Sequence, residues 1–203
     1  MKSSKATPKK ATKKKERDLT LPDIPLSKNA VKLIEKLTPK IRLGLAHINS
    51  IPVAVLLWGP GMSSRSRLRP VRLNLRRKLR ELGHAAFFSE ELYDHKLPHS
   101  LRLQQLIQAQ NFDLIVSLPA TPGAIAEIHD FIIDKRVRAK LLIFLDRSHR
   151  KGYSHQSIKA INNSPICKIE YYSKDTETMY VEEETLRYVQ SVRESKYLLA
   201  GGY

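Results

Sequence analysis

The sequence predicts an α/β fold in which a five-stranded, mostly parallel sheet is covered by helices on both faces. Three observations lead to this prediction. Short apolar runs alternate with amphipathic segments from residue 51 onward. The apolar runs are unbroken, as they are in parallel strands that are buried on both faces. Helical periodicity separates the runs, which is the pattern of successive right-handed strand–helix–strand crossovers.

Five apolar runs are the expected strands, and they comprise residues 52–58, 84–88, 113–119, 140–146 and 166–172. Amphipathic helices are expected after the first, second and third runs, and a last one covers about 180–198. A doubly wound sheet of this kind is typical of flavodoxin-like and Rossmann-like proteins, which bind ligands beyond the carboxyl ends of the strands. The loops that follow the strands are therefore the expected location of a site.

The first 50 residues differ from the rest of the chain. We expect a disordered basic tail over 1–20, a connector with short helices over 21–50, and the α/β domain over 51–203, because the tail holds almost nothing apolar. Ser27 is the expected N-cap of a short helix that Pro39 closes. A second short helix is expected over 40–50.

The composition excludes several classes of protein. The chain has 203 residues, a net charge of +16, 41% hydrophobic residues and one cysteine. The hydrophobic fraction supports a core and excludes global disorder. A single cysteine excludes an intramolecular disulfide framework, so we expect a reducing compartment, the cytoplasm. No apolar run is long enough to span a bilayer, so no membrane partner is expected.

The positive charge is concentrated in two segments. Residues 1–17 carry eight Lys or Arg and one Glu, and residues 65–80 carry seven Arg and one Lys with no acid. The second segment also has a leucine-rich stripe, so its arginines are expected to form a ridge on the other face of one helix. The predicted surface for nucleic acid or an acidic partner comprises Arg69, Arg72, Arg76, Arg80, Lys13, Lys14 and Lys15. Two other interpretations remain open, a solubilising tail and a solvated helix face.

The loop after the first strand has the composition of a phosphate-binding loop. It joins a buried strand to a helix N-terminus, where free backbone N–H groups favour an anion. Its candidate ligands are Gly59, Gly61, Ser63, Ser64 and Arg65. The loop matches neither a Walker A motif nor a GxGxxG fingerprint, and an ordinary tight turn is the alternative.

A second motif follows the third strand. Thr121, Pro122 and Gly123 lead into an apolar helix that carries Glu127 near its start, and Thr121 and Gly123 are further candidate ligand- or phosphate-binding residues. An acid there is favourable through the helix dipole alone. The alternative is a carboxylate that acts as a nucleophile at a sugar carbon, or that stabilises an oxocarbenium ion, as in glycosidases.

Three further acids are weaker candidates. Glu90 and Glu91 follow the second strand and are expected either to contact a ribose hydroxyl or to be solvated. Asp146 ends the fourth strand at the same edge of the sheet. The histidines lack metal-binding spacing, so no metal site is expected.

The segment 53–146 resembles the nucleoside 2-deoxyribosyltransferase-like superfamily, including its nucleoside 5′-monophosphate N-glycosidase branch. It is more distantly similar to TIR-type NAD glycohydrolases. The matching pieces are VAVLLW-GPGMSSR, AAFF-SEE and FDLIVSLPA-TPGAIAE. The resemblance implies that Glu127 is the nucleophile and that the first loop holds phosphate. Thr121 stands where the family has an acid, and Ala124 where it has a threonine.

The expected function is cleavage of the N-glycosidic bond of a nucleoside, a nucleotide or NAD. NAD would be a substrate here, and no resident cofactor is expected. The resemblance also implies a role in antiviral defence and a homo-oligomer that shares active sites. The alternative is a catalytically degenerate nucleotide-binding module that binds nucleic acid or an acidic protein through the tail and the arginine helix.

Overall fold

A computed structural model of the chain describes residues 25–149 and 167–200. Contacts divide the chain into one unit that ends at Lys40 and a second that begins at Ile41. Side chains at positions 122, 123, 126, 127 and 149 are not described. The predicted basic tail, with Lys13, Lys14 and Lys15, lies outside the described residues.

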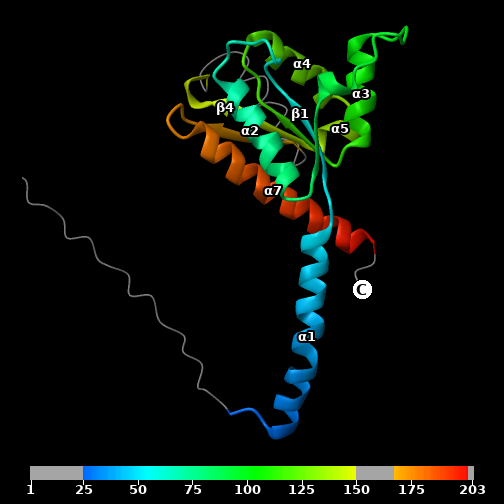
Figure 1. The fold of residues 1–203 in the computed structure, drawn as a ribbon, viewed down its shortest axis with the longest axis vertical. Coiled ribbons are helices and arrows are strands. Elements are labelled where there is room, and N and C mark those ends of the chain that lie inside the picture. The colour runs from blue at the N-terminus through cyan, green and yellow to red at the C-terminus, as the bar shows by residue number, and fades with distance from the viewer. Residues whose placement is uncertain (1–24, 150–166, 201–203) are drawn as a thin grey trace, which may run out of the picture. The chain divides into compact units, whose positions relative to one another are not determined.

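The second unit contains a five-stranded parallel sheet, which confirms the predicted fold class (Figure 1). Its strands are β1 (Ala54–Trp58), β2 (Ala85–Phe88), β3 (Leu114–Ser117), β4 (Leu141–Asp146) and β5 (Lys168–Tyr172). The spatial order is β2-β1-β3-β4-β5, and every neighbouring pair is parallel. The order reverses direction between β1 and β3, so the topological switch point lies at their carboxyl ends.

Helices cover both faces of this sheet (Figure 1). The helices of the unit are α2 (Leu68–Glu81), α3 (Leu101–Asn111), α4 (Pro122–Ile132), α5 (Lys135–Arg138) and α7 (Glu177–Leu199). Two 3₁₀ turns, η1 (Ser89–Leu92) and η2 (Arg147–His149), follow β2 and β4 directly. α2 and α7 pack on one face, and α3, α4 and α5 pack on the other.

The alternation of side chains along the strands builds two apolar layers. In β1, Val55 and Leu57 face α2 and α7, whereas Leu56 and Trp58 face α3 and α4. β3 and β4 divide their residues between the two layers in the same way. Every residue of β3 and β4 is buried, which explains why these strands read as unbroken apolar runs.

The first helix, α1 (Lys28–Ser50), differs from the prediction. Ser27 caps it as expected, because its hydroxyl accepts from the backbone N–H of Ala30 at 3.2 Å. Pro39, however, lies inside one continuous helix instead of ending the first of two. A proline removes a single helical hydrogen bond and bends the helix. The exposed backbone around it can pair with water, so the helix continues.

The single cysteine lies at the start of β5. Cys167 is buried with the apolar residues on the α3–α5 side of the sheet and forms no disulfide. Burial in these surroundings raises the pKa of its thiol to about 11. None of the helices in the described ranges is long and apolar enough to cross a bilayer.

Candidate functional site

The carboxyl ends of β1, β2 and β3 surround a small cavity at the switch point of the sheet. Its volume is about 190 Å³. Trp58 and Gly59 come from the end of β1, and Ser89 and Glu90 come from η1. The other lining residues are Gln105, Ser117, Pro119, Ala124, Ile128 and Phe131. A cavity therefore lies at the edge of the sheet where the sequence predicts a site.

Gly59 is required where β1 and β3 separate. Its φ is +154°, and a Cβ at this position would lie 3.1 Å from the carbonyl oxygen of Leu118 and 3.3 Å from Cδ of Arg72. Both distances are shorter than ordinary contacts. The glycine therefore lets the first loop pass close to the end of β3, and it keeps the cavity floor tight.

Trp58 forms an apolar wall of the cavity and carries an unused donor. Its ring packs on Phe131, with centroids 4.6 Å apart. The indole is buried, and its Nε1–H has no hydrogen-bond partner among the described residues. A buried donor without a partner is costly to the fold.

Arg72 fixes the position of Glu90 in the cavity wall. The Arg72 side chain is only 1% exposed. Its two terminal nitrogens donate to the two oxygens of Glu90, at 2.7 and 2.5 Å. The same nitrogens also donate to the carbonyl oxygens of Leu57 and Pro60. A bidentate pair of this kind holds the carboxylate in one orientation.

The pKa of Glu90 is lowered by these contacts. Partial burial alone would raise it, but the hydrogen bonds and charge of Arg72, together with the hydroxyl of Ser89, outweigh that effect. Glu90 is therefore an ionised acceptor at neutral pH. It is suited to accept hydrogen bonds from hydroxyl groups and poorly suited to act as a general acid.

The arginines of the predicted ridge differ in their exposure. Arg72 is buried, which contradicts the prediction, and Arg76 forms an ion pair with Glu91. Arg80 is 45% exposed. Arg80 donates to the carbonyl oxygen of Ala86 at 2.8 Å. The reason is that the acids and carbonyls of β2 and η1 lie beside α2, although no acid occurs within the basic segment itself. Arg69 is half-buried.

Glu91 is not part of the cavity wall. Its carboxylate accepts from Arg76 and from the backbone N–H of Phe88, the latter at 2.9 Å. Burial alone would raise its pKa, but the Phe88 N–H and the charges of Arg76 and Arg80 lower it. Of the two acids expected to contact a ribose, the structure brings only Glu90 into the cavity.

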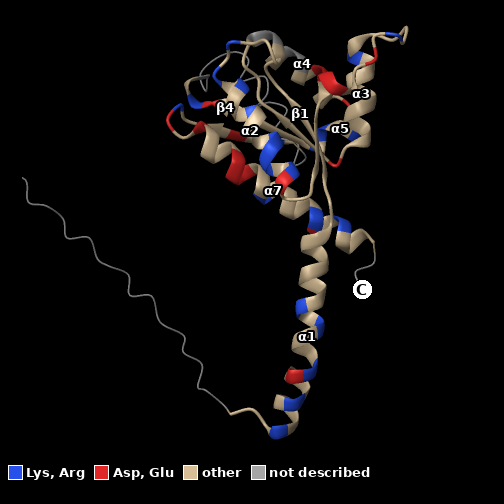
Figure 2. Cartoon of the chain, viewed as in Figure 1, with Lys and Arg blue, Asp and Glu red and all other residues tan. Residues whose placement is uncertain are grey.

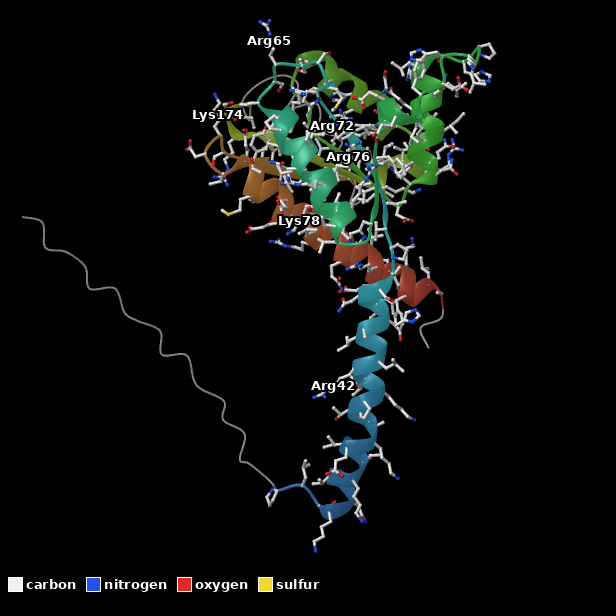
Figure 3. All side chains as sticks on the ribbon, viewed as in Figure 1. Arg42, Arg65, Arg72, Arg76, Lys78 and Lys174 are labelled. Atoms are coloured by element: carbon white, nitrogen blue, oxygen red, sulfur yellow. The ribbon has the colours of Figure 1, made fainter. Side chains whose placement is uncertain are left out.

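Most of the predicted phosphate loop lies beside the cavity rather than in it. Ser63 and Arg65 are exposed, and Arg65 extends outward from the loop (Figure 3). The hydroxyl of Ser64 accepts from the backbone N–H of Ser66 at 3.1 Å. Gly61 lies close to Glu90, since a Cβ there would be 3.9 Å from its Oε1. Only Gly59 of the predicted loop residues lines the cavity.

The motif after β3 begins α4. Thr121 is its N-cap, and its hydroxyl accepts from the backbone N–H of Ala124 at 3.2 Å. Gly123 and Glu127 lie within α4, and the structure describes the backbone of Glu127 but not its side chain. Ala124, Ile128 and Phe131 of the same helix line the cavity.

A second pocket of about 220 Å³ lies farther along the same edge, at the ends of β4 and β5. Asp146 lines it, and its carboxylate accepts from Arg67 at 2.5 Å and from the hydroxyl of Ser148 at 2.8 Å. Tyr172 and the exposed Lys174 also line it. Asp146 therefore lies apart from the cavity that Glu90 lines.

Two side chains of this second pocket have shifted pKa values. Burial alone would raise the pKa of Asp146, but the Ser148 hydrogen bonds and the charges of Arg67 and Lys174 lower it. Burial raises the pKa of Tyr172 to about 12. At neutral pH the pocket therefore holds an anionic carboxylate that is already paired and a neutral phenol.

The roles of Arg72, Trp58 and Arg67 were not predicted from the sequence. Arg72 holds Glu90, Trp58 lines the first cavity, and Arg67 lines the second pocket. The sequence does contain one signal for the burial of Arg72, which lies four residues after Leu68 and three before Leu75 and so falls on the leucine stripe. Among the residues that the structure describes, no group of three or more His, Cys, Asp or Glu could hold a metal ion.

No protein-family model matches the chain, and no curated protein is significantly similar to it in sequence.

Proposed function

We propose that the protein binds a nucleoside or nucleotide with its ribose in the switch-point cavity, and that it cleaves the N-glycosidic bond. The observation that carries this proposal is a small cavity at the switch point that Glu90 lines, with both oxygens of its carboxylate hydrogen-bonded to Arg72. Open α/β sheets bind ligands at this position. The proposal includes NAD, which contains two ribosyl groups.

The size and polarity of the cavity favour a sugar over a whole nucleotide. Sites that enclose drug-sized ligands usually have at least roughly 300 Å³. A volume of about 190 Å³ suits a ribosyl group, with the base and any phosphate outside it. Glu90 would accept from the sugar hydroxyls, and the Trp58 indole N–H would donate to a sugar oxygen.

Glu127 is the proposed nucleophile, in agreement with the family resemblance. Its backbone position lies three residues after Ala124 and four before Phe131, both of which line the cavity. Residues at such steps share one face of a helix. Position 127 therefore belongs to the helical face that borders the proposed sugar site.

The proposed reaction has two steps. In the first, a carboxylate oxygen of Glu127 bonds to the anomeric carbon while the bond from that carbon to the base nitrogen breaks. The electron pair leaves with the base. A purine or pyrimidine takes up a proton from solvent, whereas nicotinamide leaves NAD as a neutral molecule and needs none. In the second step, water attacks the anomeric carbon and loses a proton to solvent while the bond from that carbon to the Glu127 oxygen breaks, which releases the sugar and restores the carboxylate.

A second candidate is a module that binds the same ligand without cleaving it. Thr121 stands where the resembled family has an acid, and its hydroxyl is already used to cap α4. Both oxygens of Glu90 are also engaged by Arg72. These observations favour a site that holds a ribosyl group but lacks a second carboxylate to assist the reaction.

The test separates binding from cleavage. The protein is incubated with NAD, nucleosides and nucleoside 5′-monophosphates, and free base is measured by chromatography, while ligand binding is measured by calorimetry. We expect release of base by the wild type and a loss of at least about 100-fold in Glu127→Gln. Asp130→Asn is the matched control, because Asp130 is an exposed acid of α4 outside the cavity wall.

Each outcome bears on one part of the proposal. Base release that is unchanged in Glu127→Gln overturns the assigned nucleophile. Binding without release, weakened in Glu90→Gln, supports the second candidate and overturns the first. If no ribosyl ligand binds, both candidates are wrong.

A further inference from the structure

The first helix carries an apolar stripe that remains exposed. α1 has no buried residue. Its large aliphatic side chains recur mostly at three- and four-residue steps, so they share one broad face. The stripe comprises Val31, Leu33, Ile34, Leu37, Ile41 and Leu45, each between 41% and 60% exposed. A contiguous apolar surface of this kind marks an interaction site rather than scattered exposed residues.

The rest of α1 is basic. Lys28, Lys32 and Lys36 follow one another at four-residue steps on the face opposite the stripe. Lys40 and Arg42 lie near the two borders of the stripe, and Glu35 is the one acid of the helix. Figure 2 shows this excess of Lys and Arg along α1. The residues that precede the connector add a net charge of +7 over 1–17.

The irregular positions of α1 lie where they disturb the stripe least. Pro39 falls on the basic face, so the carbonyl that it leaves without a helical partner points to the polar side. Thr38 lies at the border of the stripe, and its hydroxyl donates to the carbonyl oxygen of Ile34 at 2.8 Å. A threonine whose hydroxyl is bonded within its own helix can enter apolar surroundings at low cost.

The charge and the stripe together select the occupant. Nucleic acid would satisfy the lysines but would leave the aliphatic side chains in water. A second copy of α1 would cover the stripe but would bring together two helices of the same net positive charge. Residues 1–17 are almost entirely polar, so they offer little apolar surface to cover the stripe. An anionic lipid surface offers both an apolar interior and negative headgroups.

We propose that α1 lies flat on an anionic membrane surface, with the stripe in the headgroup–acyl boundary and the lysines toward the headgroups and water. The basic residues before it would add electrostatic attraction to the anionic headgroups. The helix does not cross the bilayer, in agreement with its basic face. This surface role is independent of the ligand site at the carboxyl ends of the strands.

The experiment is flotation of the full chain with phosphatidylcholine vesicles, with and without phosphatidylserine. We expect binding that requires phosphatidylserine and that weakens as salt is added. Ile41→Asn places an amide in the stripe, and we expect it to reduce the partition coefficient about tenfold. Leu43→Asn is the matched control, because Leu43 is 73% exposed but lies on the basic face. We expect it to bind within about twofold of the wild type.

Three results would overturn the proposal. The first is equal loss of binding in the two variants, because the stripe would then have no special part. The second is binding that is the same with and without phosphatidylserine. The third is no vesicle binding by the wild type together with a dimer, measured by light scattering, that Ile41→Asn dissociates. Helicity measured by circular dichroism confirms that both variants keep α1.

Discussion

α1 and α2 are both basic amphipathic helices, but among the described residues the apolar face of α2 is covered and that of α1 is not. The leucines and valine of the α2 stripe are at most 3% exposed against the sheet. Its arginines pair with Glu90 and Glu91 of η1. The α1 stripe is exposed along the helix, and none of its cations forms an ion pair with a described residue.

The difference shows that a sequence pattern of this kind does not determine its partner. The same periodicity produces a buried structural helix where a sheet and acids lie beside it, and an uncovered surface where they do not. The two helices also differ in their basic residues. α2 contains mainly arginine, whose planar guanidinium suits the bidentate contact with Glu90, whereas α1 contains mainly lysine. Figure 3 shows Arg42 projecting from α1, whereas Arg72 is buried.

The largest expected difference between the two helices is in their apolar stripes. Leu75→Ala removes a fully buried side chain of α2 and leaves a cavity, so we expect a loss of about 3 kcal/mol in the free energy of unfolding. Leu37→Ala makes the same change in the exposed stripe of α1. It should alter the free energy by less than about 0.5 kcal/mol. Urea unfolding followed by tryptophan fluorescence measures both, and equal effects would contradict the comparison.

The next largest difference concerns the arginines. Arg72→Met keeps much of the side-chain volume but leaves the carbonyls of Leu57 and Pro60 and the Glu90 carboxylate without their donor. We expect it to cost about 2–4 kcal/mol in the free energy of unfolding. Arg77→Met is the control, because Arg77 is 72% exposed. That control should change the free energy by less than about 0.5 kcal/mol.

The smallest expected effect is a pH dependence of stability that Glu90 contributes. Its folded pKa is lowered below the ordinary value of 4.5, so the unfolded chain takes up a proton first as the pH falls. The stabilisation is therefore complete above about pH 5 and is lost as the pH falls through 4.5 toward the folded pKa. Glu90→Gln should remove this contribution to the loss of stability in acid. The contribution is no more than about 1 kcal/mol in the free energy of unfolding, because solvent screens the partly exposed carboxylate.

The control for this prediction is the comparison at neutral pH. Glu90→Gln keeps the acceptor oxygen but loses the charge opposite Arg72, so its free energy of unfolding should already be lower at pH 7. Between pH 5 and pH 3 its stability should fall less steeply than that of the wild type. If the free energy of unfolding falls equally steeply with pH in the wild type and in the variant, the pKa of Glu90 does not differ between the folded and unfolded chain, and the prediction is wrong.

The fold could be predicted from the sequence because the strands are buried on both faces. Every residue of β3 and β4 is buried, so these segments are apolar without interruption and easy to recognise. The helix boundaries were harder to predict. Pro39 was expected to end a helix, but an exposed helix tolerates a proline because water can pair with the backbone group that it leaves unpaired.

The site could be predicted to the level of an edge of the sheet but not to the level of contacts. Gly59 and Glu90 were expected there because they follow strands, and strand order alone brings such residues together. The pairing of Arg72 with Glu90 spans 18 residues and depends on how far α2 rotates over the sheet, which no local pattern encodes. The prediction that Glu127 is the nucleophile stays a prediction, because its side chain is not described.

The burial of Cys167 has a practical consequence for following the motions of this protein. The chain has one thiol, and burial raises its pKa to about 11. Reaction with a thiol reagent at neutral pH is therefore expected to be slow, and an opening that exposes the residue before β5 should speed it. The labelling rate of the unmodified protein therefore follows that opening without an engineered probe. A lower rate in the presence of a ribosyl ligand would show that binding at the carboxyl ends of the strands stabilises the amino-terminal end of β5.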